Sequence, residues 1–134
     1  MKTIHNSETT HQPRTIEAVT QSLKKLLCSY GDVAYVVGVT QDRTVKNWAE
    51  KGIIPSDPVM TSRLQVVEKL ASTVQDERRP WVSAAWLIGP NPLLSEDAPR
   101  ELLQSLQGSP DDEVTVQKLQ FAAEQFAARA SEIA

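Results

Sequence analysis

The spacing of apolar residues along the chain predicts a protein built from helices. From Thr15 onward, apolar side chains recur three and four residues apart, which is the period of an amphipathic helix; they are Ile16, Val19, Leu23, Leu26 and Leu27. Similar spacing predicts further helices over residues 33–37, 40–51, 59–74, 80–88, 99–106 and from 110 toward the end of the chain. A period of two appears only in the short run 35–39, where the bounding glycines favour a buried helix. We therefore expect an all-α fold.

Glycine, proline and capping residues predict where these helices begin and end. Because glycine adopts the left-handed backbone readily, three glycines are expected to end the first three helices: Gly31, Gly38 and Gly52. Asp32 and Thr40 are expected to cap the second and third helices. Ser109 as a cap and Pro110 in the first turn, followed by three acidic residues, predict the start of the last helix.

The core is expected to be aliphatic, because aromatic residues make up only 5% of the chain while hydrophobic residues make up 40%. Its largest side chains should be the three tryptophans, Trp48, Trp81 and Trp86. In the helix over 80–88, the side chains expected to point inward are Trp81, Ala84, Ala85 and either Leu87 or Ile88. Cys28 has apolar neighbours and is expected to be buried.

Charge divides the chain into two halves. The net charge of −3 argues at first against nucleic acid as a partner. Residues 14–79, however, hold ten Lys and Arg against eight Asp and Glu, whereas residues 80–134 hold three against eight. A mildly basic half suits a DNA-binding protein that relies on dimerisation and a few contacts more than on bulk charge.

Residues 34–52 have the spacing of a helix-turn-helix. Ala34 is small enough for the point where two helices cross steeply, and Gly38 follows four positions later, where the turn needs a residue without Cβ strain. Val39 would then fill the angle between the helices. The turn after Val39 is one residue longer than the commonest pattern, which leaves the register of Gln41 and Asp42 open.

The second helix of this motif has two faces. Val45, Trp48 and Ala49 form the stripe expected to be buried, and the opposite face gathers polar side chains. In the major groove, Arg reads guanine, Asn reads adenine and Lys holds phosphate. The predicted DNA-binding residues are Thr40, Gln41, Arg43, Thr44, Lys46, Asn47 and Lys51. The alternative is a helical hairpin whose polar face is merely solvated.

Over residues 33–105 the sequence resembles the Xre-type antitoxins whose C-terminal half is an MbcA/ParS-type toxin-binding domain. The resemblance depends on VGVTQDRTVKNWAEKG, on a helix of the RLQVVEKL kind, and on AAWLIGPNPLLSEDAPRELL. In that family, a helix with tryptophan or phenylalanine precedes an Asn-Pro turn, a leucine and a proline that opens a helix; here these are Trp86, Asn91-Pro92, Leu94 and Pro99. The longer turn resembles that of actinobacterial members. The N-terminal tail and the length of the helix after Pro110 depart from the family pattern.

This resemblance implies a two-part molecule. The N-terminal half would bind an operator in double-stranded DNA as a homodimer and repress its own operon. The C-terminal half would occlude the active site of a protein toxin, in this family often a RES-type toxin that consumes NAD. The expected organisation is a disordered tail over 1–13, a helix-turn-helix DNA-binding half over 14–79 and a small helical half, for dimerisation or toxin binding, over 80–134.

The last helix carries an apolar stripe of its own, at Val116, Leu119, Ala123, Phe126, Ala130 and Ile133. The spacing is that of a coiled-coil seam, but the stripe spans fewer than three heptads. It fits either local packing on its own domain or a surface for dimerisation or partner binding. On the second interpretation, the partner-binding residues are Phe126, Ala130 and Ile133.

No pattern in the sequence points to catalysis. His5 and His11 lie in the polar tail, Cys28 has no histidine near it, and a glycine-rich phosphate loop is missing. We expect no enzyme activity, no cofactor and no metal. The lack of a secretory signal, of a membrane span and of a second cysteine indicates the cytoplasm. Besides an antitoxin, the pattern fits a free-standing repressor of plasmid or phage type, whose C-terminal half only dimerises, or a helical adaptor without DNA affinity.

Overall fold

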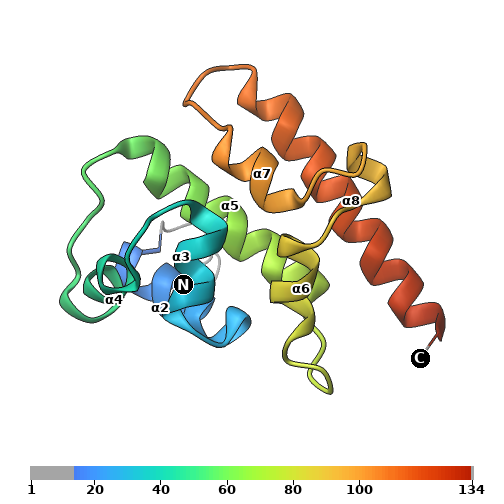
Figure 1. Cartoon of the computed structure of the whole chain (residues 1–134), viewed down its shortest axis with the longest axis horizontal. Helices are drawn as coiled ribbons and strands as arrows, with labels where there is room; N and C mark the ends of the chain where they lie inside the picture. The colour runs from blue at the N-terminus through green and yellow to red at the C-terminus, as the bar shows by residue number, and fades with distance from the viewer. Residues whose placement is uncertain (1–13, 134) are drawn as a thin grey trace, which may run out of the picture.

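The structure is a computed structural model that describes residues 14–133, with side chains through Ser131. These residues form helices and connecting turns without a strand, which confirms the expected all-α fold (Figure 1). The elements are α2 (Ile16–Leu27), α3 (Tyr30–Val37), α4 (Asp42–Lys51), α5 (Pro58–Val74), α6 (Val82–Ile88), the 3-10 helix η1 (Pro92–Leu94), α7 (Pro99–Gln104) and α8 (Asp112–Ile133). The predicted tail over 1–13 lies outside the described residues.

Helix α5 is the centre of the fold. It contacts α2 and α3 on the N-terminal side and α6, α7 and α8 on the other (Figure 1). One hydrophobic core joins both halves of the chain, and its fully buried leucines come from α2, α5, α6, α7 and α8: Leu23, Leu27, Leu64, Leu70, Leu87, Leu103 and Leu119. This continuity means that the two halves are stabilised by the same packing.

The junction between α2 and α3 differs from the sequence prediction. Helix α2 ends at Leu27 and not near Gly31, and Cys28 is its C-cap in the left-handed conformation (φ 75°). The physical reason is that the Ser29 hydroxyl accepts a hydrogen bond from the backbone N–H of Asp32 at 3.0 Å and so caps α3. Gly31 therefore lies inside α3, and Asp32 is not its cap. Cys28 is exposed, so the expectation that it is buried was wrong.

The other helix ends agree in part with the prediction. Gly38 and Gly52 adopt the left-handed conformation, as expected, with φ of 90° and 64°. Thr40 does not cap α4, because Gln41 takes the capping position without a side-chain hydrogen bond. Helix α7 ends at Gln104 and not at residue 106.

Helix α8 begins at Asp112, two residues after the predicted start at Pro110. The Asp112 carboxylate accepts hydrogen bonds from the backbone N–H groups of Gln107 and Gly108, at 3.2 and 2.7 Å. These bonds hold a compact turn before the helix and leave Ser109 and Pro110 within it. Ser109 is linked to the helix through its carbonyl, which accepts from the Asp112 N–H at 3.0 Å.

Helix α6 is rotated relative to the prediction. It buries Val82, Ser83, Trp86 and Leu87, whereas Trp81 is 60% exposed and Ala85 is also exposed. Trp81 precedes the first helical residue, so its side chain does not join the inward face. Ser83 can be buried because its hydroxyl donates to the carbonyl of Ala71 at 2.9 Å.

Candidate nucleic-acid interface and apolar groove

Helices α3 and α4, over which the sequence predicts a helix-turn-helix, are joined by a short turn at Gly38 and contact each other. Ala34 is buried, and its carbonyl accepts hydrogen bonds from the N–H groups of Gly38 and Val39 at 2.9 and 3.0 Å. Both bonds close the end of α3 and set the direction of the turn. The longer turn is accommodated by residues 38–41, which places Asp42 in the first turn of α4.

The inner face of α4 is the predicted one. Val45 and Ala49 are completely buried and Trp48 is 5% exposed. The side-chain amide of Gln21 on α2 adds a hydrogen bond to the carbonyl of Ala49 at 2.8 Å. Contacts with both α2 and α3 therefore fix α4 on the core.

The outer face of α4 presents most of the predicted DNA-binding residues to solvent. Thr40, Gln41, Arg43, Lys46 and Lys51 are exposed, whereas Thr44 and Asn47 are half-buried. Two carboxylates, Asp42 and Glu50, are exposed on the same helix. The Glu50 carboxylate accepts a hydrogen bond from the Tyr30 hydroxyl at 3.1 Å, which directs it toward α3. The exposed cations of α4 are thus Arg43, Lys46 and Lys51, which the sequence singled out.

A polar clamp, made of Arg63, Arg100 and Gln104, ties the turn of this motif to the C-terminal half. The Gln104 amide donates to the carbonyls of Tyr35 and Val36 at 2.9 and 3.0 Å. The guanidinium of Arg100 lies over the Tyr35 ring, 4.4 Å from its centroid. Helix α7 therefore completes the hydrogen bonding at the end of α3.

Arg63 on α5 is the third member of the clamp. Its guanidinium donates to the carbonyl of Val37 at 2.7 Å and to that of Leu106 at 3.2 Å, so it joins the ends of α3 and α7. Burial lowers the pKa of Arg63, while the carboxylates of Asp57 and Asp112 act in the opposite direction. Sequence spacing did not reveal the clamp, because Arg63 lies far from Arg100 and Gln104 in the chain, and all three lie far from the carbonyls and ring of α3 that they contact.

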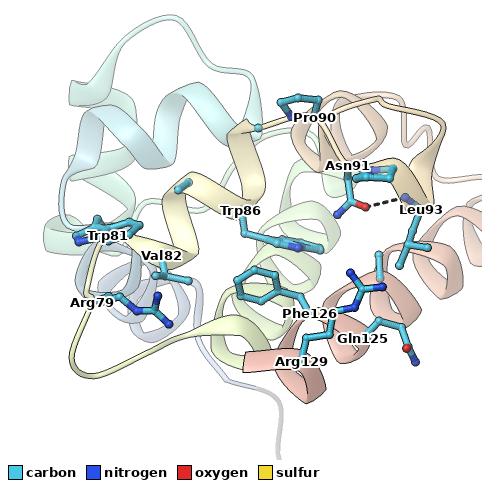
Figure 2. A pocket seen from close by; sticks show the side chains of 14 residues that line it. Arg79, Trp81, Val82, Trp86, Pro90, Asn91, Leu93, Gln125, Phe126 and Arg129 are labelled. Atoms are coloured by element: carbon cyan, nitrogen blue, oxygen red, sulfur yellow. Dashed lines mark hydrogen bonds between the residues drawn. The ribbon is translucent and has the colours of Figure 1, made fainter. Parts of the chain in front are cut away.

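An apolar groove lies between α6, the turn after it and α8 (Figure 2). Its volume is about 420 Å³, and it is lined by Arg79, Trp81, Val82, Ala85, Trp86, Gly89, Pro90, Asn91, Pro92, Leu93, Ala122, Gln125, Phe126 and Arg129. Trp86 and Phe126 face each other with ring centroids 6.5 Å apart. Sequence spacing did not reveal this groove, because the spacing predicted that Trp81 would lie in the core.

The Asn91-Pro92 turn shapes one wall of the groove. Asn91 is buried, and its side-chain oxygen accepts from the N–H of Leu93 at 2.9 Å. Its carbonyl accepts from the N–H groups of Leu94 and Glu96, both at 2.9 Å. These bonds leave the Leu93 side chain 51% exposed at the rim while Leu94 is buried.

Helix α8 packs locally along its first half and borders the groove along its second. Leu119, Ala122 and Ala123 are buried against the core, and Val116 and Phe126 are partly buried beside it. Of the predicted partner-binding residues, Phe126 lines the groove and Ala130 lines a neighbouring hollow. The side chain of Ile133 lies outside the described residues.

Other kinds of site have little support in the described residues. No helix among them is both long and apolar enough to cross a membrane. Nor do they bring three potential metal-ligating side chains of His, Cys, Asp or Glu together.

The fold is therefore that of an all-helical protein, with the α3–α4 pair in its N-terminal half and an apolar groove mainly in its C-terminal half. No protein-family profile and no curated protein sequence matches the chain significantly. Among solved structures, the fold is similar to a chain of the crystal structure of the M. tuberculosis MbcT-MbcA toxin-antitoxin complex, with a TM-score of 0.56 and 20% sequence identity. The match covers 85% of this chain and 97% of that chain, which is too large a share to lie in one half alone.

Proposed function

We propose that this protein is the antitoxin of a toxin-antitoxin pair and represses its own operon. The observation that carries the proposal is the fold shared with a chain of the MbcT-MbcA complex over 97% of that chain. The sequence supports it separately, because the Asn91-Pro92 turn and its flanking helices resemble the MbcA/ParS-type domain of antitoxins. We accordingly take the matched chain to be the antitoxin, MbcA.

Operator recognition is assigned to the outer face of α4. Arg43 would read guanine and Asn47 adenine, while Lys46 and Lys51 would hold phosphates. Thr40, Gln41 and Thr44, at the N-terminal end of α4, would contact the backbone or base edges. A homodimer would place two copies of α4 in successive major grooves.

Toxin neutralisation is assigned to the C-terminal half. By the family resemblance, the toxin is of the RES type and consumes NAD, and the antitoxin acts by covering its active site. Phe126, Ala130 and Ile133 on α8 are the proposed contacts. The protein itself would then act as a binding protein in the cytoplasm, without enzyme activity or a cofactor.

Growth of cells tests the antitoxin role. Expression of the protein encoded by the neighbouring gene should arrest growth and deplete cellular NAD. Co-expression of this chain should restore growth and the NAD level. If co-expression leaves growth arrest and NAD loss unchanged, the antitoxin role is wrong. A chain that still binds its promoter without neutralising any neighbouring toxin would be a free-standing repressor.

A gel-shift assay with the DNA upstream of its own gene tests operator binding. Arg43→Ala should cost about 1–3 kcal/mol if Arg43 reads a base, and Lys46→Ala should weaken all sequences alike and lower the salt slope by about one. A Lys69→Ala/Lys118→Ala variant removes two exposed cations outside α4 and should bind normally. Equal affinity of the Arg43→Ala/Lys46→Ala variant and the wild type would refute the assignment. No shift with the wild-type protein would favour the adaptor.

A further inference from the structure

The rim of the apolar groove combines exposed hydrophobic side chains with positive charge. Trp81 is 60% exposed and Leu93 is 51% exposed, and both line the same groove. The charged residues that line the groove are Arg79 and Arg129, both exposed, and no carboxylate lines it. This arrangement contrasts with the acidic C-terminal half in which most of the groove lies.

The two arginines differ in how they are held. Arg79 makes two hydrogen bonds to one carboxylate oxygen of Asp76, at 2.8 and 3.0 Å, and these bonds lower the pKa of Asp76 below its ordinary value. Among the described side chains, no ion pair involves Arg129. Arg129 projects from α8 beside Phe126, at the edge of the groove (Figure 2).

The groove continues beyond Phe126 into a second hollow. Arg79, Val82 and Phe126 line both, and the second hollow extends along α8 to Ala130 and Ser131. The second hollow is also lined by residues 73–78, which include the carboxylates of Asp76 and Glu77, so the part of the trough without a carboxylate is the first groove, beside Arg129. The two have volumes of about 420 and 700 Å³. A continuous trough of this length suits a stretch of polypeptide better than a single small molecule.

We propose that this trough binds a segment of a partner protein that carries a large apolar anchor and a nearby carboxylate. The anchor would lie in the groove against the rings of Trp86 and Phe126, flanked by Trp81 and Leu93, and the carboxylate would pair with Arg129. The proposal rests on the proposed function in one respect, that this segment belongs to the toxin. It goes beyond that function because it states which surface of this chain binds the partner and which side chains the partner must carry.

Charge argues against a second copy of this chain in the trough. A two-fold interface places the same surface on both copies, so that groove against groove would bring the arginines of one groove near those of the other, and Arg129 would find no carboxylate among the residues that line the first groove. Like charges at a buried contact oppose association, whereas a carboxylate of a partner would remove the conflict.

Selection from a random 12-residue peptide library, displayed on phage and presented to the full chain, tests the proposal. Enriched peptides should share a large apolar residue close to an Asp or Glu. Their synthetic versions should bind at least about tenfold more weakly to each of Trp81→Ser, Leu93→Ser and Arg129→Glu, since anchors and paired arginines dominate such contacts. All three positions are exposed, so the variants should keep the wild-type thermal midpoint.

Two matched variants on α8 serve as controls. Phe121→Ser removes an aromatic ring that is 55% exposed, and Lys118→Glu reverses an exposed charge, but neither residue lines the trough. Both should bind the selected peptides like the wild type. Peptides without the acidic and apolar pair, or equal binding by the groove and control variants, would overturn the proposal. So would a wild-type dimer in sedimentation that Trp81→Ser dissociates, because a second copy would then occupy the trough.

The same variants separate this proposal from the antitoxin function. If the wild type and all groove variants neutralise the toxin equally, the trough is not the toxin surface and the proposal fails while the antitoxin function stands. If no toxin is neutralised but the peptides behave as expected, the antitoxin function fails and the trough is assigned to another protein of the same chemistry.

Discussion

Gly38 shows how one residue can determine the geometry of the helix-turn-helix. Its φ of 90° is in the left-handed region, and a Cβ there would lie 3.1 Å from the Cγ of Gln104. Gly38→Ala should therefore destabilise the protein, by about 1–2 kcal/mol from the backbone conformation alone. The contact with Gln104 would add to this loss by weakening the clamp.

Gly31 is the matched control for this substitution. It lies within α3, and the nearest atom to an added Cβ is the Ser29 hydroxyl at 3.8 Å. Gly31→Ala should stabilise the protein by about 0.5–1 kcal/mol, because alanine restricts the unfolded chain and favours the helix. Urea denaturation of both variants measures the difference. Equal changes of the same sign in the two free energies of unfolding would mean that the left-handed backbone of Gly38 is not the reason why alanine destabilises that position.

The three tryptophans should differ sharply in their contribution to stability. Trp48 and Trp86 are 5% and 8% exposed, and replacement of either by Ala should cost about 3–5 kcal/mol. Trp81 is 60% exposed, and Trp81→Ala should cost no more than about 0.5 kcal/mol. Denaturation midpoints followed by circular dichroism test this order. A large loss from Trp81→Ala would contradict the arrangement of α6.

At the scale of elements, the clamp of Arg63, Arg100 and Gln104 should stabilise the end of α3. Gln104→Ala removes the hydrogen bonds to the carbonyls of Tyr35 and Val36 and should cost about 1 kcal/mol. Amide exchange at Gly38 and Val39 should become faster, because both N–H groups belong to the same turn. Gln107→Ala is the control, since the backbone N–H of Gln107 donates to the Asp112 carboxylate and is kept in this variant. Unchanged exchange in Gln104→Ala would show that α7 does not support the turn.

The elements also show what the sequence could predict. Period and spacing identified every α-helix of the described residues and the buried stripe of α4, because these depend on neighbours within one or two turns. The errors lie where two signals compete locally. Ser29 takes the capping role that was given to Asp32, and Cys28 takes the left-handed position expected of Gly31. The α6 register failed for a similar reason, since a helix start two residues later turned Trp81 outward.

The candidate sites were predictable to different degrees. The outer face of α4 follows from the buried stripe on its other side, so its exposed cations could be named from the sequence. The groove could not, because its walls come from three separate segments that only tertiary packing brings together: the end of the α5–α6 linker with α6, the turn at residues 89–93, and the second half of α8. The sequence singled out Phe126 through its helical spacing, and Trp86, Asn91 and Pro92 through the family resemblance, but it did not show that these residues meet in one groove.

At the scale of the whole molecule, the continuous core predicts a single unfolding transition. The charge boundary near residue 80 suggests two halves, but the core cluster includes Leu23 and Trp48 from one and Leu87 and Leu119 from the other. Helix α5 packs against elements of both. Loss of packing in either half should therefore destabilise the other.

Two variants can report on the halves separately. Trp81→Phe/Trp86→Phe keeps only Trp48, in the helix-turn-helix, and Trp48→Phe/Trp81→Phe keeps only Trp86, beside the groove. In each variant, the urea midpoint from tryptophan fluorescence should coincide with the midpoint from circular dichroism, because all helices unfold together. Distinct midpoints within one variant would show that the halves unfold independently. Coincident midpoints would mean that both halves unfold as one cooperative unit. A ligand that binds only the folded state stabilises the whole of such a unit. A partner bound at the groove would therefore also stabilise the helix-turn-helix.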